Sequence, residues 1–233
     1  MNSVIQLLGE AQGKMNGYVA LLALRYANLC VKAEAASLLS VTVPIDNEVL
    51  NIENVADVGI PEEGVLAVVP KKSLYLQKIG KSVLMAHPEF KMNIVQNEKT
   101  QDEEDKYLTF TMPQVDKARH DILCDGVDGL QKQCVSKIET VNEQYIAKIT
   151  AKLINADPET IDKVKDKLKE LHDFFSDTCN NLADNKKKEI EDAYQKYVAE
   201  QEAKKQELQE EAAAHSEEAT QQLKMDNLGD DEY

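Results

Sequence analysis

Proline placement is the strongest constraint that the sequence puts on the fold of this 233-residue chain. The six prolines all lie in the middle of the sequence, at Pro44, Pro61, Pro70, Pro88, Pro113 and Pro158. Proline lacks a backbone N–H and its ring clashes with the preceding helical turn, so it interrupts helices. The sequence therefore allows long helices at both ends and predicts shorter elements between them.

The N-terminal end, residues 2–31, has the spacing of an amphipathic helix. Its apolar side chains recur at steps of three and four residues, including Val4, Leu7, Leu8, Met15, Val19, Leu22 and Tyr26. This period places them on one helical face that has to be buried. Three glycines each weaken the first half by roughly 1 kcal/mol relative to alanine, so we expect that half to be the less stable one.

Residues 38–110 have a different character. Short β-branched runs bounded by proline, glycine or acidic turns predict strands at residues 39–43, 55–60, 65–69 and 107–110. Between the last two runs, residues 73–86 have helical spacing. Residues 96–106 are almost wholly polar or charged, so we predict a surface loop there. The middle of the chain is expected to form a small, β-rich α/β domain.

After Pro113 the helical period returns in two long apolar stripes. The first runs from Leu130 to Leu153 and the second from Ile161 to Leu182, with Pro158 in the break between them. A short break between two long amphipathic helices favours an antiparallel pair. With the N-terminal helix, this pair can form a three-helix bundle in which the apolar stripes bury one another.

The last segment, residues 195–233, has few large apolar residues, and its eleven acidic residues outnumber its four lysines. We expect a solvated helical extension that ends in a disordered segment at residues 229–233. The expected organisation is a bundle of residues 1–32 plus 113–194, a small domain of residues 33–112 and an acidic tail of residues 195–233.

Charge and hydropathy exclude several classes of protein. The formal net charge is −15, which is unfavourable for a basic nucleic-acid module, so we expect no DNA partner. The longest apolar run, residues 18–31, contains Arg25 and Asn28 and is too short to span a bilayer. No cation precedes Lys14, so neither a secretory signal nor a transit peptide is indicated.

The sequence also argues against an enzyme or a metalloprotein. It lacks the GxxxxGK[ST], HExxH, CxxC and GxSxG motifs, and a GxGxxG after a strand. Its cysteines have no metal-ligand spacing relative to the four histidines, and we interpret them as free, mostly buried thiols in a reducing compartment: Cys30, Cys124, Cys134 and Cys179. For the acidic run at residues 102–105, a solvated loop is favoured over a cation site. We expect no catalytic residue, cofactor or metal.

The order of elements and a colinear set of short segments together carry a family resemblance. The segments are residues 15–19, 32–33, 38–43, 55–63, 66–69, 76–83, 108–113 and 116–122. The first contains a Met-x-x-x-Val step, the second is a basic residue followed by alanine, and the third resembles a Leu-Leu-x-x-Val-x-Val strand. Over residues 1–194 this set resembles the ribosome recycling factor family, although no single motif is diagnostic.

The resemblance implies a fold and a function. Family members are L-shaped, with a three-helix bundle and a small α/β domain joined by two crossing strands that act as a hinge. Here the hinge would comprise Lys32, Ala33, Thr111, Met112 and Pro113. The resemblance implies a monomeric, non-enzymatic translation factor that binds the large ribosomal subunit and acts with elongation factor G to split ribosomes after termination. The bundle would dock while its partner hydrolyses GTP and pushes the small domain about the hinge.

The resemblance also implies RNA contacts on the bundle, and here the chain departs from the family pattern. Family bundles carry several arginines that pair with phosphates, whereas this chain has only two arginines. The candidate contacts with ribosomal RNA are Arg25, Lys32, Lys117, Arg119, Lys132 and Lys137. Each is explained equally well as an ordinary solvated cation. Fewer phosphate contacts predict weaker and less salt-sensitive RNA binding.

Two other functions stay open from the sequence. A protein with this fold could be a ribosome-associated silencing or assembly factor that binds a protein partner through its acidic surface, or a helical scaffold with no ribosome contact. A recycling factor needs elongation factor G and GTP, whereas a silencing factor stabilises idle ribosomes without either. The bacterial cytoplasm and the mitochondrial matrix are both compatible locations.

Overall fold

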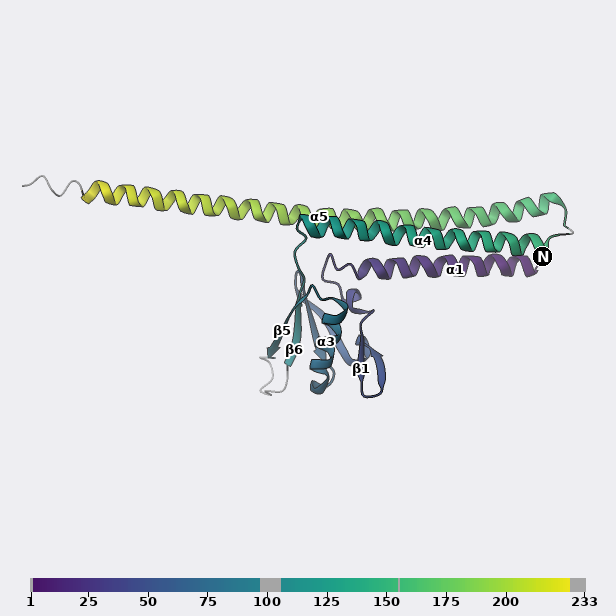
Figure 1. The fold of residues 1–233 in the computed structure, drawn as a ribbon, viewed down its shortest axis with the longest axis horizontal. Coiled ribbons are helices and arrows are strands. Elements are labelled where there is room, and N and C mark those ends of the chain that lie inside the picture. The colour runs from purple at the N-terminus through teal and green to yellow at the C-terminus, as the bar shows by residue number, and fades with distance from the viewer. Residues whose placement is uncertain (1, 97–105, 155, 227–233) are drawn as a thin grey trace, which may run out of the picture.

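Three long helices dominate the computed structural model, which describes residues 2–96, 106–154 and 156–226. They are α1 (Asn2–Ala27), α4 (Lys117–Lys152) and α5 (Pro158–Asp226). These helices pack side by side, and a small α/β lobe projects from one end of the bundle (Figure 1). The α+β, L-shaped architecture is therefore confirmed, with α5 extended past the corner of the L (Figure 1).

The lobe between α1 and α4, which we call the small lobe, contains ten short elements within the described residues. They are η1 (Ala35–Leu38), β1 (Thr42–Ile45), β2 (Glu48–Asn51), α2 (Ile52–Val55), β3 (Ala56–Glu62), β4 (Val65–Pro70), η2 (Ser73–Tyr75), α3 (Leu76–Ala86), β5 (Lys91–Gln96) and β6 (Lys106–Thr111). Strands β1 and β2 form a hairpin, and the others form an antiparallel sheet in the order β3-β4-β6-β5. Helix α3 packs between this sheet and β1.

The bundle buries the three apolar stripes that the sequence predicts. Met15 of α1, Ile138 and Tyr145 of α4, and Leu168 and Ile190 of α5 are all almost fully buried in one core. Full burial of an aliphatic side chain contributes about 1.5–3 kcal/mol, so each stripe depends on the other two for its stability. The bundle is therefore a single cooperative rod.

The small lobe has its own hydrophobic core. Leu66, Ile79, Leu108 and Phe110 have no exposed surface and pack between α3 and the sheet. Gly80 lets α3 approach the sheet closely, because a Cβ there would lie 2.8 Å from the sulfur of Met92 and the end of that side chain would have to move. The two cores are separate clusters, so the molecule has two centres of stability.

Several boundaries differ from the sequence-based prediction. The strand predicted at residues 39–43 begins only at Thr42, because Leu38 and Val41 turn into the core of the small lobe from η1 and the turn that follows it. Strands β2 and β5 were not predicted, since β2 is mostly exposed and β5 carries polar residues and an exposed Ile94. The loop predicted at residues 96–106 lies almost wholly outside the described residues.

The C-terminal extension is helical, as expected from the sequence for the part before residue 229. Helix α5 continues to Asp226, and the side chains of residues 202–213 are all exposed. Residues 229–233, for which disorder was expected, lie outside the described part of the chain. Within that part, none of the helices has both the length and the apolar character needed to cross a membrane.

Two thiols meet in the bundle core and predict a stability loss at high pH. The sulfur atoms of Cys134 and Cys179 lie 3.2 Å apart, and burial and the neighbouring thiol raise the pKa of Cys179 to about 12. An unfolded thiol ionises near pH 9, so this contribution to stability is complete below pH 9 and is lost as the pH rises towards 12. We expect urea unfolding to show a loss of about 1.4 kcal/mol per pH unit above pH 9 for this thiol.

The matched variants isolate that contribution from the titration of other groups. Between pH 9 and 11, Cys179→Ala should lose the extra decrease in the free energy of unfolding with pH. Cys124→Ser, which alters a half-buried thiol of α4, should keep most of that decrease. Equal slopes in the wild type and Cys179→Ala would contradict the prediction.

Candidate functional site

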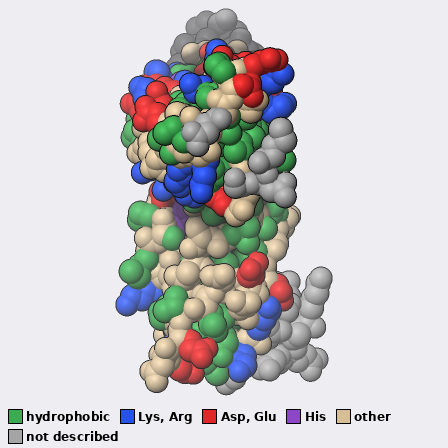
Figure 2. Space-filling view, turned by 90° about the vertical axis from the view of Figure 1, so that its right-hand side faces the viewer, with side chains coloured by type: hydrophobic (Ala, Val, Ile, Leu, Met, Phe, Trp, Pro, Cys, Tyr) green, Lys and Arg blue, Asp and Glu red, His purple; other side chains and the backbone are tan. Residues whose placement is uncertain are grey.

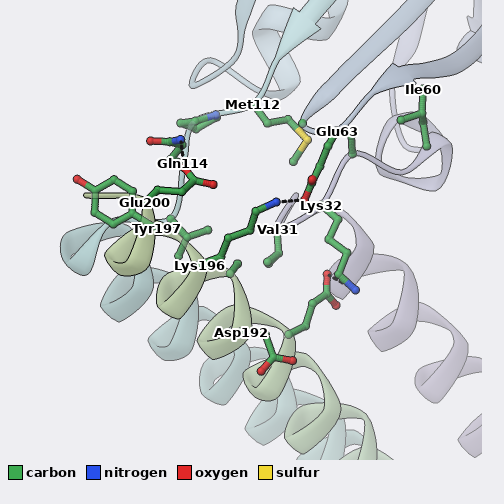
Figure 3. A pocket seen from close by; sticks show the side chains of 16 residues that line it. Val31, Lys32, Ile60, Glu63, Met112, Gln114, Asp192, Lys196, Tyr197 and Glu200 are labelled. Carbon is green, nitrogen blue, oxygen red and sulfur yellow. Dashed lines mark hydrogen bonds and ion pairs between the residues drawn. The ribbon is translucent and has the colours of Figure 1, made fainter. Parts of the chain in front are cut away.

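The bundle and the small lobe meet at a cleft that contains both chain connections between them. The cleft has a volume of about 620 Å³ and is lined by the first connection at Val31, Lys32 and Ala33 and by the second at Met112 and Pro113. The turn between β3 and β4 and the last bundle turns of α5 form its remaining walls (Figure 3). Every residue predicted for the hinge except Thr111, the last residue of β6, therefore lines one cleft.

Polar contacts cross this cleft from α5 to the small lobe and its second connection. Lys196 donates a hydrogen bond to Glu63 over 2.5 Å, and Gln114 donates one to Glu200 over 3.1 Å (Figure 3). Hydrogen bonding between Lys196 and Glu63 lowers the pKa of the carboxyl and raises that of the amine. Both side chains are largely solvent-exposed, so water and salt weaken the attraction.

Arg119 contacts the start of the first connection. Its Nη2 donates to the carbonyl of Cys30 over 3.3 Å, and its backbone N–H is capped by Asp116 at the start of α4. Cys30 has a positive φ of 52°, a conformation uncommon for a residue with a Cβ, and it follows the end of α1. Arg119 therefore positions the strained residue that follows α1. One nitrogen of its guanidinium group is already hydrogen-bonded, so that nitrogen is less available as a candidate RNA contact.

The structure separates the remaining candidate cations into two settings. Lys32 pairs with Glu189 over 3.8 Å and Lys117 with Asp121 over 2.6 Å, so both are held by acids near the cleft. Lys132 and Lys137 are exposed on α4, and neither forms an ion pair within the described residues. Lys132 and Lys137 are thus the candidate cations most available to an anionic partner.

Arg25 and Lys137 lie on the same side of the bundle. Arg25 donates to Gln133 of α4 over 3.3 Å, and Lys137 lies one helical turn beyond Gln133. Lys14 and Lys148 continue this row, because each lies eleven residues, about three helical turns, from Arg25 and Lys137 respectively, and both place their ammonium groups over the ring of Tyr145. Lys132 lies about 140° around α4 from Lys137 and belongs to another side.

Acidic side chains interrupt the cations over the visible bundle surface. Figure 2 shows acidic and basic groups interspersed at the end of the bundle, with no large region of one sign on that face. With a net charge of −15, the whole molecule opposes approach to an anion, so a row of cations has to act at short range.

The sequence analysis missed the residues that join the two parts across the cleft. Lys196 and Glu63 are 133 positions apart, and Gln114 and Glu200 are 86 apart. Each is an unremarkable polar residue in its own segment, so only the fold brings the partners together. The row formed by Lys14 and Lys148 was missed for the same reason.

Lys196 provides a direct test of the contacts across the cleft. We expect Lys196→Ala to broaden the range of angles between the small lobe and the bundle without unfolding either core. Small-angle X-ray scattering should detect the broader distribution. Salt at about 1 M should broaden the distribution of lobe–bundle angles in the wild type in the same way. It should have little further effect on that distribution in the variant.

Lys204→Ala is the matched control, because Lys204 is exposed on α5 about two turns beyond Lys196. It should leave the scattering unchanged. A Lys196→Ala profile identical to the wild type at low salt would show that the contact does not restrain the lobe.

Comparisons with known proteins agree with this architecture. Residues 26–190 match the family described as ribosome recycling factor. The chain is similar to a solution structure of the ribosome recycling factor, with 16% identity, a TM-score of 0.65 and coverage of 82% of this chain and 99% of that one. No curated protein matches the chain.

A second solved structure has the same fold. It contains models for the T. thermophilus ribosome recycling factor and the E. coli elongation factor G bound to the E. coli post-termination complex. The identity is 18%, the TM-score is 0.55, and the match covers 80% of this chain and 98% of that one. Because the family match spans most of the sequence, from the end of α1 through the bundle segment of α5, the chain belongs to the ribosome recycling factor family.

Proposed function

We propose that this protein promotes the splitting of ribosomes after termination, acting with elongation factor G and without chemistry of its own. The observation that carries the proposal is the arrangement of a rigid three-helix rod and a separate lobe, joined by two adjacent connections (Figure 1). Force applied to the lobe can then reach whatever the rod has bound. The proposed setting is a bacterial cytoplasm or a mitochondrial matrix.

The proposed domain division follows the two cores. The bundle would comprise residues 1–32 and 113–194, and the small domain residues 33–112. Lys32, Ala33, Thr111, Met112 and Pro113 would form the hinge. Support for this proposal comes from the two side-chain hydrogen bonds across the cleft, Lys196 to Glu63 and Gln114 to Glu200, which join exposed residues and can break without disturbing either core.

The bundle would bind RNA of the large ribosomal subunit through cations. We propose Arg25 and Lys137 as the central contacts, since they share one side of α1 and α4. Lys132 would make a separate contact from the outer side of α4. Lys32, Lys117 and Arg119 would contribute from the cleft end, where acids and the Cys30 carbonyl already engage them.

The test is a splitting assay on purified post-termination ribosomes, measured by light scattering. The protein should accelerate subunit dissociation only when elongation factor G and GTP are both present. A non-hydrolysable GTP analogue is the matched control. Equal dissociation rates with and without this protein, in the complete mixture, would contradict the proposal.

One observation favours a second function. The segment of residues 195–233 is acidic, the side chains of residues 202–213 in it are exposed, and the chain has only two arginines, which suits a protein partner better than RNA. A ribosome-associated silencing or assembly factor would use these features. Such a factor should stabilise idle ribosomes against dissociation in the absence of elongation factor G and GTP, which is the opposite result in the same assay.

A further inference from the structure

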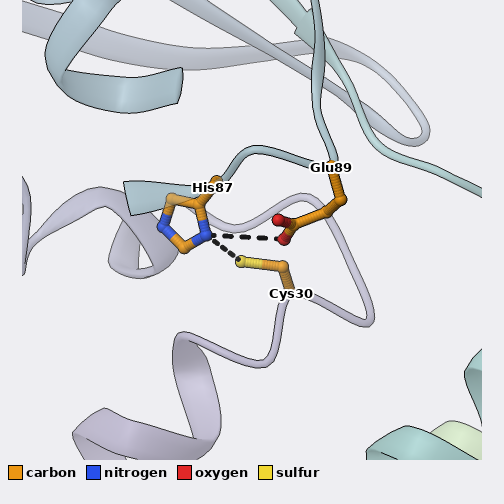
Figure 4. A group of neighbouring side chains, drawn as sticks. All are labelled: Cys30, His87 and Glu89. Carbon is orange, nitrogen blue, oxygen red and sulfur yellow. Dashed lines mark hydrogen bonds and ion pairs between the residues drawn. The ribbon is translucent and has the colours of Figure 1, made fainter. Parts of the chain in front are cut away.

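Three potential metal ligands from distant parts of the chain converge at the entrance to the small lobe. The Sγ of Cys30 lies 3.5 Å from Nδ1 of His87, and that nitrogen lies 3.6 Å from Oε1 of Glu89 (Figure 4). All three ligand atoms lie within 4.8 Å of one another. No metal site was expected from the sequence, because 57 positions separate Cys30 from His87 and their spacing matches no metal-binding motif.

The surroundings of His87 leave its inward nitrogen free to bind a cation. Its other nitrogen, Nε2, lies 3.2 Å from the carbonyl oxygen of Ser37. A carbonyl can only accept, so Nε2 donates to it, and in the neutral imidazole Nδ1 presents a lone pair to the thiol and the carboxylate. A hydrogen bond from the other ring nitrogen to a backbone carbonyl is the arrangement that orients metal-bound histidines.

The group facing that lone pair is also an acceptor. Glu89 presents a carboxylate oxygen to Nδ1, and two acceptors at this distance repel each other unless a proton or a metal ion lies between them. The ring of His87 is almost fully buried and stacks on Phe90, with 4.8 Å between ring centres. The ring is therefore held with Nδ1 facing the thiol and the carboxylate.

We propose that Cys30, His87 and Glu89 bind one divalent metal ion of the zinc class, with a fourth position open to water. Zinc–sulfur and zinc–nitrogen bonds of about 2.3 and 2.0–2.1 Å in a tetrahedron place sulfur and nitrogen about 3.5 Å apart. The Cys30–His87 separation fits this value. The carboxylate needs a small side-chain movement, which is available because Glu89 is one-third exposed.

The charge of the site also suits a divalent ion. A thiolate and a carboxylate together carry two negative charges, which neutralise a divalent cation. Metal binding releases the thiol proton to solvent as the sulfur–metal bond forms. The exposed edge of Glu89 provides the path by which a hydrated ion enters.

A metal ion here would fasten the exit of α1 to the small lobe. Cys30 lies two residues before Lys32 and has its carbonyl held by Arg119 of α4, while His87 and Glu89 follow α3. The ion would therefore join the first connection to the core of the small lobe, and would stabilise the lobe more than the bundle.

Cobalt substitution tests the site in the full-length reduced protein. Co²⁺ should produce a thiolate-to-cobalt charge-transfer band and the strong visible bands of tetrahedral cobalt, and Zn²⁺ should bleach both. Cys30→Ser should remove the charge-transfer band. Glu89→Gln, a change at an exposed residue, should weaken Co²⁺ binding by about tenfold or more.

Cys124→Ser is the matched control, because Cys124 lies 3.8 Å from Nε2 of His120 and forms a second thiol–imidazole pair. It should leave the spectrum unchanged. Circular dichroism verifies that each variant is folded. The absence of cobalt bands in the wild type, or bands that survive in Cys30→Ser and disappear in Cys124→Ser, would overturn the proposal.

Discussion

Charge reversal of Lys132 and Lys137 together is expected to abolish cosedimentation with large ribosomal subunits, and Lys137→Glu alone is expected to cause most of the loss. Lys137 shares a side of the bundle with Arg25, so its reversal places an acid inside the row of cations. Each lost phosphate contact should lower the slope of log affinity against log salt by about 0.7–0.9. Sedimentation at several salt concentrations measures both effects.

Two single variants serve as controls for this prediction. Lys132→Glu changes the outer side of α4 and should have the smaller effect. Lys165→Glu reverses an exposed lysine of α5 that forms no ion pair within the described residues, and should bind as the wild type does. Unchanged cosedimentation of the Lys132 and Lys137 double variant would reject this site.

Phe110→Ala is expected to cost about 3–5 kcal/mol of stability in the small lobe, the usual range for truncating a buried phenylalanine. Phe110 lies on β6, has no exposed surface and belongs to the core between α3 and the sheet. The bundle core shares none of its buried residues with that cluster, so the three long helices should keep their stability. Hydrogen exchange resolved by peptide should show faster exchange in β3, β4 and β6 while α4 stays protected.

Ile138→Ala provides the reciprocal variant, because Ile138 is fully buried in the bundle core. It should cost about 2–5 kcal/mol there and leave the small lobe protected. Faster exchange throughout the chain in both variants would show that the two cores unfold as one unit. Phe110→Ala also tests the proposed function, since it should bind ribosomes through the bundle but fail to split them.

The long helices were predictable from the sequence because the pattern that specifies them, apolar residues at the helical period, is local and repeats along each segment. In α4, the apolar positions Cys134, Ile138, Val141, Tyr145 and Ile149 follow the helical period and are buried as predicted. No proline interrupts this stripe, so no break in the helix was expected there. A resemblance spread over many short segments then predicted how the helices and the lobe are connected, and the family match confirms it.

The details of the small lobe were less predictable because tertiary contacts decide them. Residues 39–41 have the composition of a strand but do not form one, since Leu38 and Val41 are turned into the core. Strand β2 has an unfavourable composition and forms because β1 pairs with it. The contact of Lys196 with Glu63 and the cluster around Cys30 depend on distant segments that no local pattern links.

The overhang of α5 has a consequence for how the molecule moves in solution. The 26 residues 201–226 form a helix about 39 Å long, beyond the last turns that touch the cleft. A rod of this length increases frictional drag while adding little mass. The 26.1 kDa chain should therefore elute early from a size-exclusion column, as a larger globular protein would, and light scattering is the measurement that gives its true molar mass.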